Sequence, residues 1–252
     1  MDNHRLTTNL ASVLTLAIVW ELLGRSLQTI LIPPLSQIGS AWIRLVKDGG
    51  LVENLILSMG TLAVGFVLAV IFGVTIGVLM GRFQGVEHLL DLYVNALMAA
   101  PTISFIPVLI LWFGLGVQSR IAVVFLFSFF VIAINTQTGV KHVDPALVEM
   151  ARSFGAKGRE LFFKVELPAA LPMIMAGIRM GMGRAVKGMI TGEMLLALTG
   201  MGAMIMQYGS AFATDALFAI ILTILAVALI AMKLIQAIDR RLTGWKVEIA
   251  IE

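Results

Sequence analysis

Four ionisable residues stand inside one long apolar run, where charge is expensive. They are Arg179, Arg184, Lys187 and Glu193, in the run from Leu171 to Leu198. A charge at the centre of a membrane-spanning helix costs about 2.5 to 3.5 kcal/mol, so such residues usually face a cavity or a partner. At 100° per residue, Arg184 and Lys187 lie about 60° apart on one helical face. Arg179 and Glu193 lie about 40° apart on another face.

The pair Arg184 and Lys187 has the chemistry of an anion site in a translocation path. A guanidinium and an ammonium group both attract anions, and a water-filled cavity would keep them solvated. The alternative is structural: the two cations could pair with acidic groups elsewhere or stabilise the contact with a second copy of the chain. Both readings stay open, with Lys187 favoured for the path because it should lie deeper. Glu193 is predicted as a path residue with them.

A polar cluster ends the apolar run from Ile121 to Val140. Asn135, Thr136, Gln137 and Thr138 follow one another at a depth where lipid would leave their polar groups unsatisfied. They should therefore face protein or water. We predict Asn135, Thr136 and Thr138 to lie in a pore vestibule; hydrogen bonding between helices is the alternative.

Two prolines should bend the preceding run, from Val94 to Phe113. Pro101 and Pro107 each lack the N–H that a continuous helix needs. Irregular backbone within a membrane is tolerated only beside protein or a water-filled cavity. Thr102 and Ser104 are therefore candidate gate or lining residues.

Other chemistries have no matching residues. The absence of cysteine excludes disulfides, thiolate metal sites and a cysteine nucleophile. His4, His88 and His142 form no H-E-x-x-H pattern, and no Ser, His and Asp set is indicated at one depth, which argues against an intramembrane enzyme. No G-x-x-x-x-G-K-[ST] loop is present to cradle nucleotide phosphates. We predict no bound cofactor or metal, and no nucleic-acid surface because the basic residues are scattered.

The elements that carry these residues are membrane spans. Of 252 residues 59% are hydrophobic and 13% are charged, against about 25% charged in soluble domains. About 20 apolar residues cross a bilayer as a helix, so we predict an all-α membrane protein with one domain over residues 1–252. The six long runs are Leu10 to Ile32, Leu55 to Met80, Val94 to Phe113, Ile121 to Val140, Leu171 to Leu198 and Ala216 to Ile238.

The second run contains a ladder of small residues. Gly65, Gly73, Gly77 and Gly81 repeat at spacings that are multiples of four. Such a ladder lets a neighbouring helix approach closely. We favour this packing role over a role in a pore.

The basic residues set the orientation, because Lys and Arg are retained on the cytoplasmic side. With the N-terminus inside, both termini and the segment 141–168 are predicted to be cytoplasmic, and the protein is placed in the cell membrane. The inside residues are Arg5, Arg82, Lys141, Arg152, Lys157, Arg159, Lys164, Lys233, Arg240, Arg241 and Lys246, against Arg44, Lys47 and Arg120 outside.

A charged insert separates the fourth and fifth runs. Asp144 is a good N-cap, and Pro145 suits the first position of a helix. Gly155 is placed to end that helix with a positive φ. The predicted helices are Pro145 to Phe154 and Arg159 to Val165, followed by Leu167, Pro168 and the fifth run.

One face of the first predicted helix is apolar. Leu147, Met150, Ala151 and Phe154 line up along it. Charged residues surround this stripe. Together they predict a rigid surface at which a soluble partner could bind and move the insert. A hairpin resting on lipid headgroups is the alternative. The polar residues of the fourth and fifth runs would suit a passive channel equally well, but a channel does not need such a docking surface.

The insert resembles the EAA loop of ABC importer permeases. That loop reads E-A-A, three residues, G, nine residues, I, one residue, L-P. Met150 and Val165 depart from this pattern, and both replacements are apolar. The residues that match it are Glu149, Ala151, Gly155, Leu167 and Pro168.

Further segments are similar to permeases of the nitrate, sulfonate and taurine import group. They are Ala100 to Gly116, Ile134 to Leu147, Gly177 to Ala185 and Gly192 to Gly202, and the similarity extends from about Pro33 to Trp245. The resemblance implies a type I importer fold, with about six transmembrane helices and a cytoplasmic coupling helix. It also implies a second permease copy, a pair of cytoplasmic ATPase subunits that bind ATP and Mg, and an external substrate-binding protein.

The resemblance also implies roles for residues of the insert. In this family the helix of the EAA loop sits in a cleft of the ATPase. The implied substrate is a small anion such as nitrate, a sulfonate, taurine or an aromatic carboxylate, and the embedded cations favour an anion. The residues expected to couple the chain to the ATPase are Asp144, Pro145, Glu149, Ala151, Gly155, Leu167 and Pro168.

Overall fold

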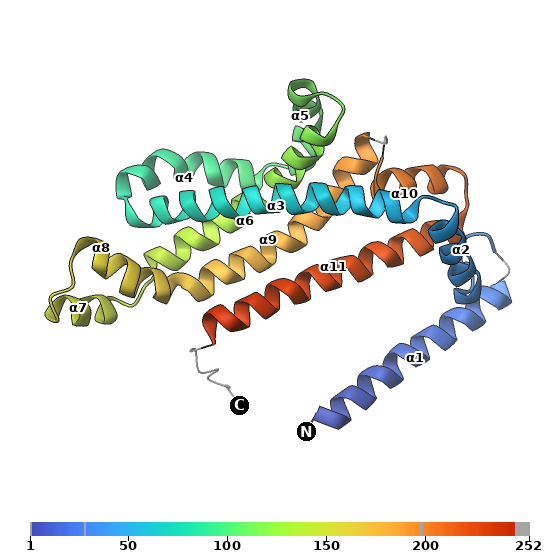
Figure 1. Ribbon diagram of the computed structural model, residues 1–252, viewed down its shortest axis with the longest axis horizontal. Helices are drawn as coiled ribbons and strands as arrows, with labels where there is room; N and C mark the ends of the chain where they lie inside the picture. The colour runs from blue at the N-terminus through green and yellow to red at the C-terminus, as the bar shows by residue number, and fades with distance from the viewer. Residues whose placement is uncertain (1, 28, 197–198, 245–252) are drawn as a thin grey trace.

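The computed structural model describes residues 2–27, 29–196 and 199–244, and every regular element within them is a helix (Figure 1). The predicted all-α class is confirmed. The elements are α1 (Asp2–Leu27), α2 (Leu35–Lys47), α3 (Leu51–Arg82), α4 (Gln84–Ala99), a 3-10 turn (Thr102–Phe105), α5 (Ile106–Phe113), α6 (Val117–Lys141), α7 (Pro145–Ser153), α8 (Gly158–Leu161), a π-helical segment (Phe162–Glu166), α9 (Leu167–Leu196), α10 (Met201–Ser210) and α11 (Thr214–Thr243).

Four helices among the described residues are long and apolar enough to cross a membrane. They are α3, α6, the continuous helical rod of residues 158–196, and α11. A fifth span exists if α4 and the segment 102–113 are taken as one. The first of the six predicted crossings falls in α1, a helix of 26 residues that is not among these spans.

The third predicted crossing is a bent pair of helices. α4 and the segment 102–113 meet at 100°. Ala100 at the break is extended (φ −67°, ψ 144°), because a residue before proline is pushed out of the α region. Pro107 lies in the first turn of α5, where its missing N–H costs nothing. The predicted bend is therefore confirmed at Pro101, whereas the prediction that Pro107 bends the helix is wrong.

The core of the fold is α6, which packs against α3 and α9 through glycines of both helices. A Cβ atom added at Gly73 of α3 would lie 2.9 Å from Ile132 Cγ2 of α6. One added at Gly181 of α9 would lie 2.7 Å from Ile132 Cγ1. Lipid provides no hydrophobic drive for helix association, so such close packing holds the bundle together. The ladder predicted in α3 is confirmed; a second ladder in α9 completes it, with Gly177, Gly188 and Gly192 also against α6.

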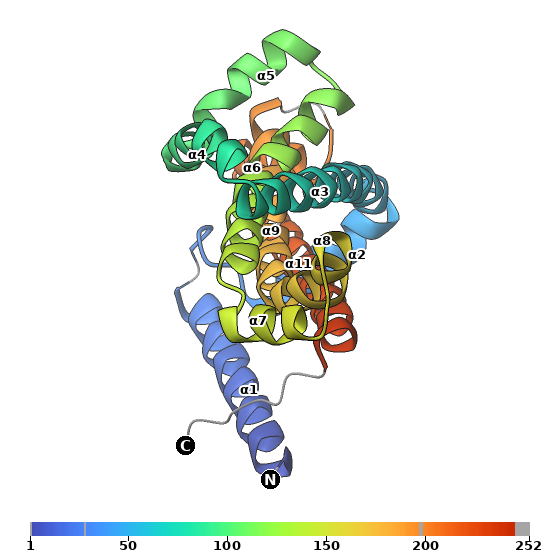
Figure 2. The same ribbon diagram turned by 90° about the vertical axis from the view of Figure 1, so that its left-hand side faces the viewer.

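The end of the bundle opposite α7 is closed by α2, α10 and α11 (Figure 1). Ile38, Met201 and Ile220, one from each of these helices, are buried in a shared cluster. α1 projects from this end (Figure 1). α4 and α5 lie on the side of the bundle that faces away from α1 (Figure 2). The Glu21 carboxylate of α1 accepts hydrogen bonds from the Ser36 N–H and hydroxyl, which ties α1 to the start of α2.

Gly77→Ala should destabilise the protein, whereas Gly60→Ala should not. A Cβ atom at Gly77 would lie 2.4 Å from the carbonyl oxygen of Ala133, so α3 and α6 would have to separate. Overpacking of this kind costs about 1–3 kcal/mol. Gly60 on the same helix has no atom within 4 Å of an added Cβ. We expect thermal unfolding in detergent to give a lower Tm for Gly77→Ala only; equal Tm values would contradict the close contact.

Candidate functional site

The insert between α6 and α9 begins with a capped helix. The Asp144 carboxylate accepts a hydrogen bond from the Ala146 N–H at 2.9 Å, and Pro145 occupies the first helical position. At the other end, Gly155 has φ +89°. Its N–H and that of Ala156 donate back into the last turn of α7, the pattern of a Schellman cap. The predicted helix and caps are confirmed, with the helix ending at Ser153.

α7 presents an apolar face that no described residue covers. Leu147 is 41% exposed, Met150 55% and Phe154 87%. Ala151, on the inner side, is buried, and α7 contacts α8 and the π-helical segment there. The Glu149 side chain is exposed beside the face. α8 and the π-helical segment therefore support the buried side of α7, while its apolar side is exposed.

The exit of the insert is one continuous rod with α9. α8, the π-helical segment and α9 follow one another without a break from Gly158 to Leu196. Leu167 and Pro168 open α9 directly after the π-helical segment. Pro168 has no N–H to donate, and a π-helical segment already alters the hydrogen-bond ladder at this point. The second predicted helix therefore has no free end and continues into the fifth run.

One face of α9 carries exposed cations. Arg184 and Lys187 are both exposed, and within the described part of the chain neither forms an ion pair. Met180, on the same face, is 50% exposed, and Leu195 is 53% exposed. The alternative that the two cations pair with acidic groups of the same subunit is therefore not what the described residues show. The face is available to solute or to a second copy.

Arg179 points away from this face and has a structural partner. Its guanidinium donates to the Asp239 carboxylate of α11 at 2.9 Å, and the carboxylate side chain is only 14% exposed. A charge at membrane depth is tolerated when it is paired in this way. The pair ties α9 to α11.

Glu193 lies inside the packing of the subunit. Its side chain is 0% exposed, and Oε2 accepts hydrogen bonds from Ser58 Oγ at 2.8 Å and the Gly202 N–H at 3.0 Å. The Ser58 hydroxyl in turn accepts from the Met201 N–H at 2.9 Å. The prediction that Glu193 lines the path is not met in this conformation, because so enclosed a carboxylate cannot touch a solute. It joins α3, α9 and the start of α10.

The polar cluster of α6 is divided among different neighbours. Thr136 is 0% exposed and packs against Gly77 of α3, so its predicted place in a vestibule is not met here. The Asn135 amide donates to the Val131 carbonyl at 2.7 Å, and its Cβ packs on α9. Thr138 is half-buried near the end of α6. Consecutive residues of a helix point 100° apart, so residues 135–138 could not all share one face. A path role for Asn135 and Thr138 stays a prediction.

Thr102 and Ser104 lie in the 3-10 turn at the break between α4 and α5. Thr102 is half-buried and Ser104 is exposed. A break between two helices at membrane depth is a place where irregular backbone borders protein or water. Their role in a gate stays a prediction.

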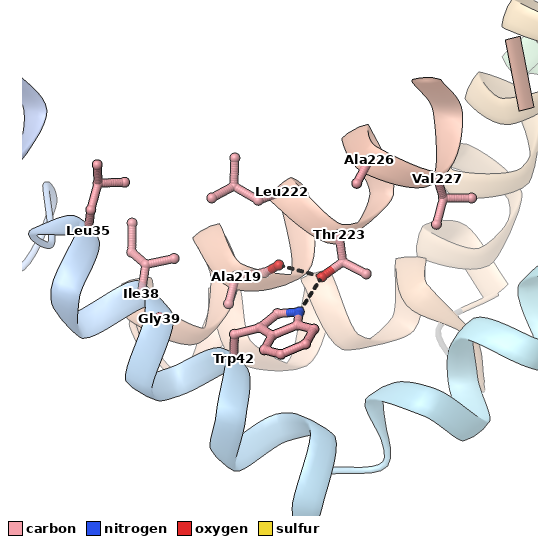
Figure 3. A pocket seen from close by; sticks show the side chains of 9 residues that line it. All are labelled: Leu35, Ile38, Gly39, Trp42, Ala219, Leu222, Thr223, Ala226 and Val227. Carbon is pink, nitrogen blue, oxygen red and sulfur yellow. Dashed lines mark hydrogen bonds between the residues drawn. The ribbon is translucent and has the colours of Figure 1, made fainter. Parts of the chain in front are cut away.

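An apolar groove lies between α2 and α11 (Figure 3), at the end of the bundle opposite α7 (Figure 1). Its volume is about 380 Å³, and the Trp42 indole donates to Thr223 Oγ1 across it at 3.1 Å. No charged side chain lines it, so it lacks the groups that would recognise an anion. The lining residues are Leu35, Ile38, Gly39, Trp42, Ala219, Leu222, Thr223, Ala226 and Val227.

The contacts that hold the insert in place had no sequence signal. Arg82 at the end of α3 pairs with Glu166 in the π-helical segment. Glu87 in the first turn of α4 pairs with Lys141 at the end of α6. The predicted topology puts all four on one side of the membrane, but it does not say which charge meets which.

Comparison with known proteins agrees with this geometry. Residues 69–244 match the family described as binding-protein-dependent transport system inner membrane component. A Methanocaldococcus jannaschii protein, whose name assigns it to the ABC transporter permeases, is 32% identical over 91% of this chain and 88% of its own. The taurine transport system permease protein TauC of Escherichia coli is 28% identical over 98% and 92%. The structure of the methionine ABC transporter MetNI has a TM-score of 0.66 at 18% identity, covering 78% of this chain and 97% of that one. The chain therefore belongs to the binding-protein-dependent transport system inner membrane components, the permeases of ABC importers, and has the type I importer fold.

Proposed function

We propose that this permease forms the translocation path of an ATP-driven importer together with a second copy of itself. A pair of separate ABC ATPase subunits would bind ATP and Mg and supply the energy, and an external binding protein would deliver the substrate. The chain itself would bind no cofactor. The observation that carries the proposal is the exposed apolar face of α7. The helix is capped at both ends, packs on α8 and the π-helical segment, and leaves this face uncovered by any residue that the structure describes.

The ATPase would bind the coupling face, by which we mean Leu147 and Met150 of α7 and Phe154 directly after it. Movement of this face would pass through α8 and the π-helical segment into α9, because these elements form one rod. α9 contributes both the Arg184 and Lys187 face and the glycine contacts with α6. Tilting this rod would open the path to one side of the membrane and then to the other, which is alternating access between two global states.

The substrate that this path favours is a small organic anion with a sulfonate or carboxylate group. The cations Arg184 and Lys187 are free of acidic partners in the described subunit and face away from its core. A fork-shaped guanidinium suits a multidentate oxyanion, and an ammonium adds a point charge. The similarity to a taurine permease supports a sulfonate, since taurine carries one.

The coupling face would lie in the cytoplasm. Lys and Arg collect around α7 and the ends of α3 and α6 that adjoin it, as the positive-inside rule requires of a cytoplasmic side. Both termini would lie on this side, in the cytoplasmic membrane. The single membrane domain would include the whole chain.

Phe154→Ala should weaken the association with the ATPase. The Phe154 side chain is 87% exposed at the end of the coupling face, so its removal takes away contact area without altering the fold. Phe212→Ala is the matched control, because Phe212 is 73% exposed at the opposite end of the molecule. The measurement is co-elution of the purified ATPase with each variant. Equal loss in both variants, or in neither, would count against docking at α7.

Gly155→Val should uncouple transport while the protein still inserts and folds. The φ of +89° at Gly155 is a conformation that a β-branched residue resists, at a cost of about 1–2 kcal/mol. The turn after α7 would be displaced, and the coupling face with it. Gly60→Val is the control, since Gly60 of α3 is exposed with no atom within 4 Å of an added Cβ. ATP-dependent uptake at the control level in Gly155→Val would rule out this role.

Lys187→Met should lower uptake of taurine in proteoliposomes. The change keeps the length of the side chain and removes the charge, so the attraction of an anion is lost and the helix is kept. Lys233→Met is the control, because Lys233 is an exposed cation on α11. Unchanged uptake in Lys187→Met, with ATPase activity intact, would assign Lys187 to a structural contact.

A further inference from the structure

The turn between α3 and α4 touches both ends of the insert. We name residues 82–87 the α3–α4 corner. Glu87 of this corner accepts a hydrogen bond from the Lys141 ammonium, the last residue before the insert, and one from the Gln137 amide at 3.1 Å. The Arg82 guanidinium donates to Glu166 Oε2 at 2.8 Å at the exit of the insert. One short turn therefore holds the entry and the exit together.

Arg82 also bridges the π-helical segment from end to end. Glu166 is the last residue of that segment and Phe162 is the first. The guanidinium carbon of Arg82 lies 4.4 Å from the centroid of the Phe162 ring, within the range of a cation–π contact. Phe162 is buried, and the Arg82 and Glu166 side chains are 29% and 21% exposed. The contact is thus better shielded than an ordinary surface ion pair.

A π-helical turn is a weak joint in a helical rod. Its i→i+5 hydrogen bonds interrupt the regular ladder of the α-helix, and π-bulges are frequent at functional sites and at points where helices kink. This one lies between the coupling face and α9, where any movement must pass. By contrast, Lys164 of this segment pairs with Glu160 of α8, one turn earlier in the same rod, and the two side chains are 73% and 54% exposed.

We propose that the α3–α4 corner is a clamp that makes the insert transmit force. Arg82 is a positioning residue that stiffens the π-helical joint, and Glu87 fixes the entry. Displacement of α7 then moves α9 and the adjoining ends of α3 and α4 as one body and is not absorbed at the joint. This inference rests on the proposed docking of an ATPase at the coupling face.

The test uses the absence of native cysteine. Met180→Cys places a single thiol on the exposed α9 face, and its rate of reaction with a water-soluble maleimide is measured with and without ATP in the complex with the ABC ATPase that co-elutes with the chain. Coupling commonly changes an equilibrium by about 5- to 150-fold, so ATP should alter the labelling rate of this parent by about tenfold. Adding Arg82→Gln should leave ATPase co-elution and ATP turnover in place but remove most of the labelling response. Glu87→Gln should do the same.

Two further variants separate the clamp from a general loss of charge. Glu160→Gln removes the exposed ion pair between α8 and Lys164 of the π-helical segment and should leave the ATP response unchanged. The double variant Arg82→Glu with Glu166→Arg restores an ion pair and should recover most of the response. A full response in Arg82→Gln, or no recovery in a folded double variant that binds the ATPase, would overturn the clamp. Failure of the parent chain to bind any ABC ATPase would instead refute the proposed function.

Discussion

The close contact of α6 with α3 and α9 is the constraint on which the rest of the structure depends. In lipid the helices gain little from burying apolar surface against each other, so their association rests on shape. Glycines at Gly73 and Gly181 bring both neighbours against Ile132 of α6. Because α6 ends at Lys141 and α9 follows the insert, the same packing sets the separation of the two ends between which α7 hangs.

The insert is fixed at both ends of its first helix and continues into α9. Its helix is closed at one end by Asp144 and at the other by a glycine cap. The rod that follows runs without a break into the helix with the exposed cations. Arg82 of α3 contacts both ends of the π-helical segment in this rod. In the proposed mechanism these contacts would let docking at α7 tilt α9.

Local patterns predicted much of this molecule. Helix caps depend on residues a few positions apart, so the start of α7 at Pro145 and the positive φ of Gly155 could be read from the chain. The break at Pro101 is local in the same way, because a proline ring pushes the residue before it, here Ala100, out of the α region. At Pro107 the rule misled, because proline in a first turn starts a helix. The second glycine ladder, in α9, is present in the sequence, but which helix packs against it depends on the fold, which places α6 between α3 and α9.

The positions of the apolar segments, the bounds of the insert and the presence of cations in the fifth run all follow from the order of residues along the chain. Residue order and helical periodicity are enough to read them. What each polar residue faces depends instead on how the helices pack. Glu193 and Thr136 turn inward against α3, and Arg179 pairs with Asp239. Arg184 and Lys187 are exposed and have no acidic partner within the described ranges. The periodicity of a helix fixes the direction in which each side chain points. The residue that it meets there depends on how segments distant in the sequence pack against the helix.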